Sequence, residues 1–419
     1  MSELFNRREN LFNKMPDDSL CILFAGAAKL CSEDAQYPFM SNRNFYYFTN
    51  IEQENSILVM IKSTFDKKTY LFIDEYDEVK EKWTGKRITN DQARRTSDID
   101  DIRTTNTFES FLSLALGSSN NQFGKIKTVL IDLSPELKIK SSFSTENFKA
   151  FLEAEYSNVE VKDIYQSIVE LRMVKSQIEI ENIVSAIQGT NSGICDTIFR
   201  MKPYMYEYEL SDNFEFYGRK NGFRELAFPT ITAGGKNATC LHYPSQKCQI
   251  SESELVLFDL GYKFNGYSAD ISRTYPINGK FEGKAKEIYE AVLECNKAVI
   301  KYVRAGMTIA DLQKYTIEFL KEECIKRGLM SKDDDIKKYY YHNISHHLGL
   351  DTHDASLRDK PLENGNVITV EPGLYFANYG IGVRIEDDVL ISEGFGECLS
   401  KDIFKEVSDI ERLLSSKKN

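Results

Sequence analysis

The sequence predicts two domains: an N-terminal α/β domain over residues 1–165 and a C-terminal α+β domain over residues 166–411, followed by a frayed tail at 412–419. Three observations support this prediction. The chain has 419 residues, more than one hydrophobic core usually serves. Its first part alternates strand-like and helix-like segments. Its second part places long amphipathic helices around two strand-like hairpins.

In the N-terminal part, short apolar runs predict strands, and one amphipathic segment predicts a helix. We expect the strands at 20–24, 56–61, 69–73 and 128–133, and the helix at 145–156. This part holds no glycine-rich phosphate loop, so the sequence gives no support for nucleotide binding there.

In the C-terminal part, helix signals recur at wide intervals. Ser176 and Glu179 have the spacing of a capping box, and apolar residues follow at helical intervals. A second helix is expected at 284–303, and a third begins at Thr308, with Asp311 three residues on. Hairpins are expected at 254–276 and 367–391.

The composition limits the classes of function. The formal net charge is −11, which argues against nucleic acid and against an anionic membrane surface as partners. The eight cysteines show no CxxC pair and no pairing rhythm, which is typical of a reduced, cytoplasmic protein. The N-terminus lacks the apolar region of a signal peptide, and we expect no membrane anchor.

Each hairpin of the C-terminal part carries an acidic residue on each arm. If the connecting loop has an even number of residues, paired positions have numbers whose sum is odd. Asp259 and Asp270 satisfy this rule in the first hairpin, and Glu371 and Glu386 satisfy it in the second. Each pair should therefore share one face of its hairpin.

Facing carboxylates destabilise a ladder unless a cation lies between them. Two divalent cations would balance four converging carboxylates. Carboxylate-rich ligation suits Mn²⁺ best, with Zn²⁺, Co²⁺ or Fe²⁺ as alternatives. Taken singly, Glu386 could instead form an ion pair with Arg384, and we expect Asp387 and Asp388 to be a solvated edge.

All the histidines lie in the same half of the chain as the four carboxylates. There are five, and four of them cluster in the segment YYHNISHHLGLDTHD. Imidazole is a common ligand for divalent cations, so this distribution favours a metal site over five separate structural roles. The histidines are His242, His342, His346, His347 and His353.

Five sequence stretches resemble the pita-bread metallopeptidases, the family of aminopeptidase P (Xaa-Pro aminopeptidase) and prolidase. They are HYPSQ, DLGYKFNGYSADISRTYP, SHHLGLDTHD, VITVEPGLY and GVRIED, in the family's order. The N-terminal stretches YPFMSNRNFYYFTN and KWTGKR are similar to aminopeptidase P. The resemblance therefore implies a creatinase-like N-terminal domain and a C-terminal pita-bread catalytic domain.

The resemblance also implies the roles of individual residues. Asp259 would bind one metal, Asp270 and Glu386 would bridge both, and His346 and Glu371 would complete the second. Glu371 would also act as the general base.

Further residues are implied to act on the substrate. His353 would stabilise the oxyanion, His242 would hold the substrate or the leaving nitrogen, and Arg384 would assist proton movement. His342 would line a proline pocket, and Arg358 would contact the C-terminal side of the substrate. Trp83 would approach the substrate site of a neighbouring subunit, and a surface or core role is the alternative. His347 matches no required position and is interpreted as structural.

The function implied by the resemblance is hydrolysis of the N-terminal Xaa-Pro bond of peptides by a cytoplasmic homodimer or homotetramer. A prolidase, which splits Xaa-Pro dipeptides, is the alternative, and the N-terminal resemblance favours the aminopeptidase. Metal-free creatinase-like hydrolysis and an inactive peptide- or protein-binding module are less favoured, because the ligand set is intact.

Overall fold

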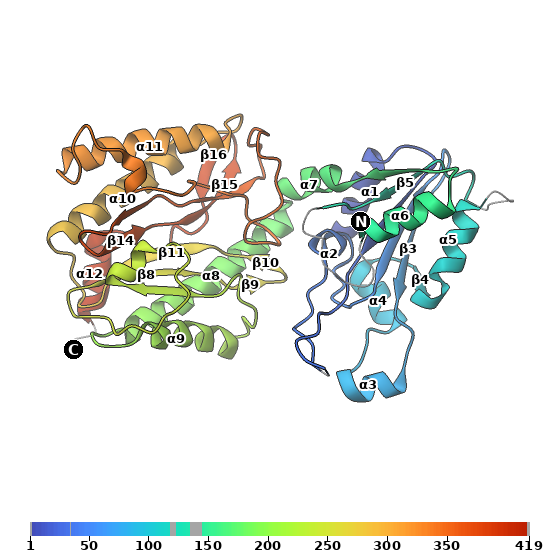
Figure 1. Ribbon diagram of the computed structural model, residues 1–419, viewed down its shortest axis with the longest axis horizontal. Coiled ribbons are helices and arrows are strands. Elements are labelled where there is room, and N and C mark those ends of the chain that lie inside the picture. Colours follow the sequence, from blue (N-terminus) through green and yellow to red (C-terminus); the bar gives the residue numbers. More distant parts are fainter. Residues whose placement is uncertain (1, 34, 118–122, 135–144, 417–419) are drawn as a thin grey trace. The chain divides into compact units, whose positions relative to one another are not determined.

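The computed structural model describes residues 2–33, 35–117, 123–134 and 145–416. The chain divides into two compact units, Met1–Arg172 and Met173–Asn419 (Figure 1). The first unit is α/β and the second combines helices with small antiparallel sheets. The predicted fold class is confirmed.

The first unit contains one sheet and seven α-helices among its described residues. Its strands are β1 (Ser19–Phe24), β2 (Ile57–Lys62), β3 (Lys67–Ile73), β4 (Asp101–Thr104), β5 (Thr128–Ile131) and β6 (Glu160–Asp163). Its helices are α1 (Glu3–Lys14), α2 (Arg43–Thr49), α3 (Glu78–Thr84), α4 (Asn90–Ser97), α5 (Phe108–Leu116), α6 (Thr145–Glu155) and α7 (Tyr165–Met173).

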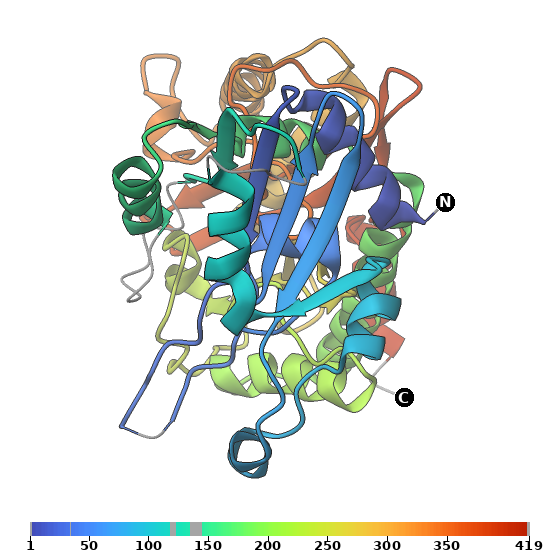
Figure 2. The same ribbon diagram turned by 90° about the vertical axis from the view of Figure 1, so that its right-hand side faces the viewer.

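The sheet has the order β4-β3-β2-β1-β5-β6. Strand β1 is paired on both sides, antiparallel to β2 and parallel to β5, which explains why its sequence SLCILF is apolar along nearly its whole length. Apolar side chains of α5 and α6 pack on one face of the sheet. Figure 2 shows α5 in front of the strands.

The division between the units falls later than the boundary expected at residue 165. The end of α7 is tied to α2: the Arg172 guanidinium donates to the Asn44 side-chain oxygen at 2.7 Å, and the Tyr47 hydroxyl donates to the Leu171 carbonyl at 3.3 Å. These long-range hydrogen bonds place α7 up to Arg172 in the first unit.

The second unit contains the two predicted hairpins and the three predicted helices. Its strands are β7 (Ile231–Gly234), β8 (Leu255–Leu260), β9 (Lys263–Phe264), β10 (Tyr267–Ser268), β11 (Ile271–Pro276), β12 (Val367–Val370), β13 (Gly373–Phe376), β14 (Ile381–Arg384), β15 (Asp387–Ser392) and β16 (Phe395–Cys398). Its helices are α8 (Gln177–Arg200), α9 (Glu207–Lys220), α10 (Gly283–Tyr302), α11 (Ile309–Lys326) and α12 (Val407–Ser415).

The capping boxes that the sequence predicts are present at the N-termini of α8 and α11. The Glu179 carboxylate accepts from the Ser176 N–H at 2.9 Å before α8. Thr308 and Asp311 exchange hydrogen bonds at 3.2 and 2.9 Å before α11. Helix α8 packs with α9, and α10 packs with α11. Figure 1 shows the strands of this unit between the two helix pairs.

The C-terminal tail differs from the prediction. Residues 412–415, expected to be frayed, form the last turn of α12. Ile410 and Leu414 are buried and four residues apart, so they lie on one face of the helix. The Phe281 N–H also donates to the Glu411 carboxylate at 2.9 Å. Burial of this short apolar face explains why the segment is helical.

Candidate metal centre and active site

The first predicted hairpin consists of β8 and β11 and carries Asp259 and Asp270. Ser272 lies opposite Asp259, and Asp270 directly precedes the first residue of β11. The two aspartates are therefore diagonal neighbours on one face, as the parity rule predicted. The hairpin closes at Asn265 and Gly266, whose φ angles of 48° and 83° suit an Asn-Gly turn.

The second hairpin holds Glu371 and Glu386 opposite each other. Strand β12 pairs with β15 and β13 pairs with β14 in one continuous register, and both glutamates fall at the break between these ladders. The Glu371 N–H donates to the Ile344 carbonyl, and the Glu386 N–H donates to the Ser272 carbonyl, each at 3.0 Å. The second bond ties the second hairpin to the first.

His346 comes from the loop that precedes β12. Its N–H donates to the Thr369 hydroxyl at 3.1 Å, and its Nδ1 lies 3.0 Å from the His347 carbonyl oxygen. Its Nε2 is thereby directed at the carboxylates, 3.3 Å from Asp270 Oδ2 and 3.5 Å from Glu371 Oε1. A histidine that binds a metal through Nε2 commonly donates its Nδ1–H to a backbone carbonyl, which fixes the orientation of the ring.

The five predicted metal ligands meet in one place. Ligand atoms form three overlapping groups, and within each group all of them lie within 4.8 Å of one another. The groups are Asp259, Asp270 and Glu386; His346, Glu371 and Glu386; and Asp270, His346 and His353. Asp270, Glu386 and His346 each belong to two groups. Of these, only the two carboxylates offer two oxygen atoms each, so Asp270 and Glu386 are suited to bridge two cations.

Burial and mutual repulsion raise the pKa values of these acids. Burial is the larger cause for Asp270, whose pKa lies well above its usual range, and the Glu386 charge adds to it. Burial also raises the pKa of Glu371 well above its usual value. The pKa of Glu386 rises to about 7 through burial and the Asp259 charge. Such a cluster is costly to keep ionised without cations.

The donor set fits divalent metal ions. It offers four carboxylates and one imidazole, a combination that suits Mn²⁺ and other first-row ions. Asp259 Oδ1 is buried and has no hydrogen-bond partner within the described part of the chain. An oxygen without a partner in a group of three acids is consistent with cation binding at this site.

One protein cation already lies beside the acids. Arg384 is buried, and its guanidinium contacts Asp259 Oδ2 at 2.6 Å, the Ser272 hydroxyl at 2.7 Å and the Tyr375 hydroxyl at 3.2 Å. Ser272 in turn donates to Glu386 Oε2 at 2.6 Å. Arg384 is thus paired with Asp259. The alternative interpretation of the sequence had paired it with Glu386.

Sequence reasoning missed Tyr375 and Ser272. Tyr375 is buried, and its hydroxyl lies 2.9 Å from His342 Nε2, which links that histidine to Arg384. Burial, followed by the Arg384 charge, lowers the pKa of His342 to about 3, so this imidazole is neutral. Tyr375 follows Glu371 by four residues on the same arm, a spacing that could have indicated it.

The remaining predicted histidines lie at the rim of the cluster. His353 is exposed, and its ring centroid is 4.1 Å from that of His346. Partial burial and the neighbouring His346 and His242 lower its pKa. His242 is also exposed and close enough for its charge to act on both His342 and His353. His347 is buried and bridges to Ile368 through the backbone.

Two predicted substrate contacts lie outside the cluster. Arg358 is an exposed residue of the loop after His353. Trp83 belongs to the first unit, on α3, and its side chain is 86% exposed. Neither residue contributes to the three groups of ligand atoms.

Asp387 and Asp388 are not the solvated edge that the sequence suggested. Both are fully buried, because β15 is the central strand of the sheet β12-β15-β16. Asp387 accepts hydrogen bonds from Arg273 at 2.7 Å and from Lys405 at 2.6 Å. Asp388 accepts from the Asp270 N–H at 3.2 Å and so supports a predicted ligand.

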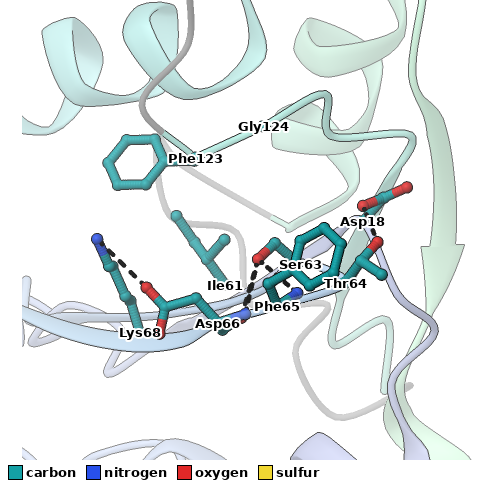
Figure 3. Close-up of a pocket in the computed structure, with 9 residues that line it drawn as sticks. All are labelled: Asp18, Ile61, Ser63, Thr64, Phe65, Asp66, Lys68, Phe123 and Gly124. Carbon is teal, nitrogen blue, oxygen red and sulfur yellow. Dashed lines mark hydrogen bonds and ion pairs between the residues drawn. The ribbon is translucent and has the colours of Figure 1, made fainter.

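A separate hollow of about 270 Å³ lies in the first unit (Figure 3). Its polar side chains are largely paired with one another: Asp66 with Lys68 at 3.5 Å, and Asp18 with Thr64 at 3.3 Å. Such pairing leaves few polar groups to recognise a ligand, and we assign the hollow no function.

None of the described helices combines the length and the apolar composition that are needed to span a membrane.

Two hairpins that bring four carboxylates together beside an imidazole are typical of a metal-dependent hydrolase. The chain belongs to metallopeptidase family M24, whose model matches residues 181–393. Residues 4–123 match the aminopeptidase P N-terminal domain. It is accordingly a metallo-aminopeptidase, and the resemblance noted in the sequence is confirmed.

The similarity to individual proteins extends over the whole chain. The Xaa-Pro aminopeptidase of Escherichia coli K12 is 30% identical, over 98% of this chain and 97% of that protein. A Bacillus anthracis structure assigned as an aminopeptidase P is 40% identical, with a TM-score of 0.94 and coverage of 99% and 98%. Zinc-substituted E. coli aminopeptidase P with product is 28% identical, with a TM-score of 0.90 and coverage of 100% and 99%.

Proposed function

We propose that this protein is an Xaa-Pro aminopeptidase that removes the first residue of peptides with proline in second position. The observation that carries the proposal is the convergence of Asp259, Asp270, His346, Glu371 and Glu386 on one site. The names of relatives similar along the full chain support this specificity over that of a prolidase.

The proposed cofactor is a pair of divalent cations, with Mn²⁺ as the preferred metal. Asp259 would hold one cation, His346 and Glu371 the other, and Asp270 and Glu386 both, in accord with their places in the overlapping groups. When bound, such a pair polarises the scissile carbonyl group and lowers the pKa of a water molecule.

Glu371 is the proposed general base. Its Oε1 lies 3.3 Å from the Thr369 hydroxyl and its Oε2 lies 3.7 Å from His342 Nδ1, so the carboxylate is held at the centre of the site. From there it can accept the proton of the attacking water and deliver it to the leaving nitrogen.

The histidines at the rim are proposed to act on the substrate. His353 would donate a hydrogen bond to the oxygen of the tetrahedral intermediate. His242 would hold the substrate near the leaving nitrogen. Arg384, linked to Asp259 and Tyr375, would assist proton movement.

Specificity for proline requires a dedicated pocket, because the Xaa-Pro bond is a tertiary amide without an N–H group. His342 and Tyr375 would line that pocket, and the neutral state of His342 suits an apolar ring. Arg358 would contact the part of the substrate that follows proline, and Trp83 would contact the substrate of a neighbouring subunit.

Three wider properties belong to the proposal. The enzyme would act in the cytoplasm on peptides, with no nucleic-acid or membrane partner, as the charge of −11 favours. It would assemble as a homodimer or homotetramer. Sedimentation of the purified protein would test the oligomeric state, and fractionation of its cells would test the location.

The decisive experiment compares Ala-Pro-Ala, Ala-Ala-Ala and Ala-Pro as substrates of the Mn²⁺-loaded enzyme. The proposal predicts release of alanine from Ala-Pro-Ala, much slower cleavage of Ala-Pro and no cleavage of Ala-Ala-Ala. Faster cleavage of the dipeptide would make the protein a prolidase. Cleavage of Ala-Ala-Ala at a similar rate would contradict the specificity for proline.

A further inference from the structure

A buried carboxylate outside the metal cluster holds the loop that carries His242. Glu207 is the first residue of α9, and none of its surface is exposed to solvent. His242 lies in the segment between β7 and β8, which begins with a short 3-10 helix, Gly235–Thr239. Nothing in the metal chemistry requires an acid at residue 207.

The Glu207 carboxylate accepts four hydrogen bonds, all from β7 or from this segment. Its Oε1 accepts from the Gly234 N–H and the Asn237 side-chain amide, each at 2.8 Å. Its Oε2 accepts from the Cys248 N–H at 3.0 Å and the Tyr243 hydroxyl at 3.1 Å. Four bonds use the acceptor capacity of a carboxylate in full.

The four donors lie on both sides of His242 in the sequence. Gly234 and Asn237 precede it, and Tyr243 and Cys248 follow it, so a single side chain fixes both ends of the segment. The Glu207 N–H also donates to the Cys248 carbonyl at 3.0 Å. The carboxylate therefore fixes the ends of the loop from the rigid end of a helix.

The residues next to His242 are anchored from a second direction. Leu241 and Tyr243 pack against an apolar cluster that includes Leu257 and Tyr375. Leu257 lies on β8, the strand that carries Asp259, and Tyr375 contacts Arg384. The imidazole of His242 is exposed, but its neighbours Leu241 and Tyr243 are fixed by this packing. Their positions determine where His242 lies relative to the metal centre.

We propose that Glu207 is a positioning residue that fixes the His242 loop and thereby sets the place of His242 at the active site. The catalytic part of this inference rests on the proposed function, in which His242 holds the substrate. The holding of the loop follows from the four hydrogen bonds alone.

Glu207→Gln is the sharpest test of the contacts. A glutamine side chain has one oxygen and one NH₂ group, and either orientation turns the NH₂ group toward two of the four donors. We expect faster hydrogen exchange of the backbone amides of residues 234–248, measured by mass spectrometry. Unchanged exchange in this segment would overturn the proposal.

Glu179→Gln is the matched control. Glu179 is also a buried carboxylate in the first turn of a helix, and it accepts from the Ser176 N–H at 2.9 Å and the Tyr267 hydroxyl at 2.8 Å. Its replacement should leave exchange of residues 234–248 unchanged. If Glu207→Gln does not fold, Tyr243→Phe removes one of the four bonds and permits the same comparison.

Kinetics on Ala-Pro-Ala test the catalytic part. Glu207→Gln should lower kcat/KM by about 10- to 100-fold, and His242→Ala should lower it as well. The double variant should be no slower than His242→Ala, because Glu207 acts through His242. Losses that multiply, or wild-type turnover by His242→Ala, would overturn the positioning role.

The exchange experiment separates this inference from the proposed function. If the wild-type enzyme did not cleave Ala-Pro-Ala, the proposed function would fail. The exchange comparison between Glu207→Gln and Glu179→Gln would still decide whether Glu207 holds the loop.

Discussion

At the scale of single residues, the second unit uses buried charge in two ways. The carboxylates of the metal cluster are only partly paired: Asp259 Oδ1 has no hydrogen-bond partner among the described residues. They are therefore available to bind cations. One residue beyond Glu386, Asp387 is equally buried but is fully paired with Arg273, Lys405 and the Ser400 hydroxyl. Its pairing makes it a structural residue.

Asp387→Ala should therefore destabilise the protein strongly. It would leave the guanidinium of Arg273, which is wholly buried, without its carboxylate, and breaking such a pair costs about 3–5 kcal/mol. Urea unfolding followed by circular dichroism would measure the loss. Asp402→Asn, at an exposed position nearby in the sequence, should change stability by less than about 0.5 kcal/mol.

Thiol reactivity should follow burial. Burial raises the pKa of Cys324 to about 12 and that of Cys295 well above the usual value, so both stay protonated at about pH 8. Iodoacetamide should label the exposed Cys31, Cys240 and Cys248 of the folded protein. Peptide mapping would check this, and rapid labelling of Cys324 before unfolding would contradict it.

At the scale of elements, the parity of two hairpins was enough to predict which acids face each other. That parity is local: it depends on a turn and a register, both of which the sequence encodes nearby. The burial of Asp387 and Asp388 was predicted wrongly, because it depends on β16 and Lys405, which join β15 only in the folded unit. Tyr375 was missed although its spacing from Glu371 was visible, because its contact with His342 forms only in the folded unit.

The first hairpin should be intolerant of a side chain at Gly261. A Cβ atom there would lie 1.9 Å from the Ala269 carbonyl oxygen, so Gly261→Ala must push the two arms apart and separate Asp259 from Asp270. We expect weaker metal binding and a loss of at least about 1–3 kcal/mol of stability.

Gly26→Ala provides the comparison for that variant. Its Cβ would meet no atom within 4 Å, although its φ of 91° adds backbone strain. It should cost about 1 kcal/mol without affecting metal affinity. Calorimetric titration with Mn²⁺ would separate the two variants, and equal affinities would contradict the account of the hairpin.

At the scale of the whole molecule, the division into an α/β unit and a catalytic unit was predictable from alternating elements and chain length. The position of the division was not, because α7 is tied to α2 by hydrogen bonds between residues far apart in the sequence. The helical end of the tail was also missed, because the burial of Ile410 and Leu414 depends on packing within the folded unit.

Metal removal should destabilise the second unit in particular. Without cations, the buried acids of that unit repel one another and bind protons instead, as their raised pKa values indicate. Metal at about a hundred times its Kd would add about 2.7 kcal/mol to stability. Calorimetry with and without a chelator should show the unfolding transition of the second unit at lower temperature when metal is absent.

The metal content of the purified protein tests the central claim most directly. After reconstitution with Mn²⁺ and removal of excess metal, mass spectrometry of the elements should find two metal ions for each wild-type chain, and fewer for Asp270→Ala, which lacks a shared ligand. A wild-type chain that takes up no metal, or an Asp270→Ala chain that binds as much as wild type, would contradict the claim that the five side chains meet around a pair of cations.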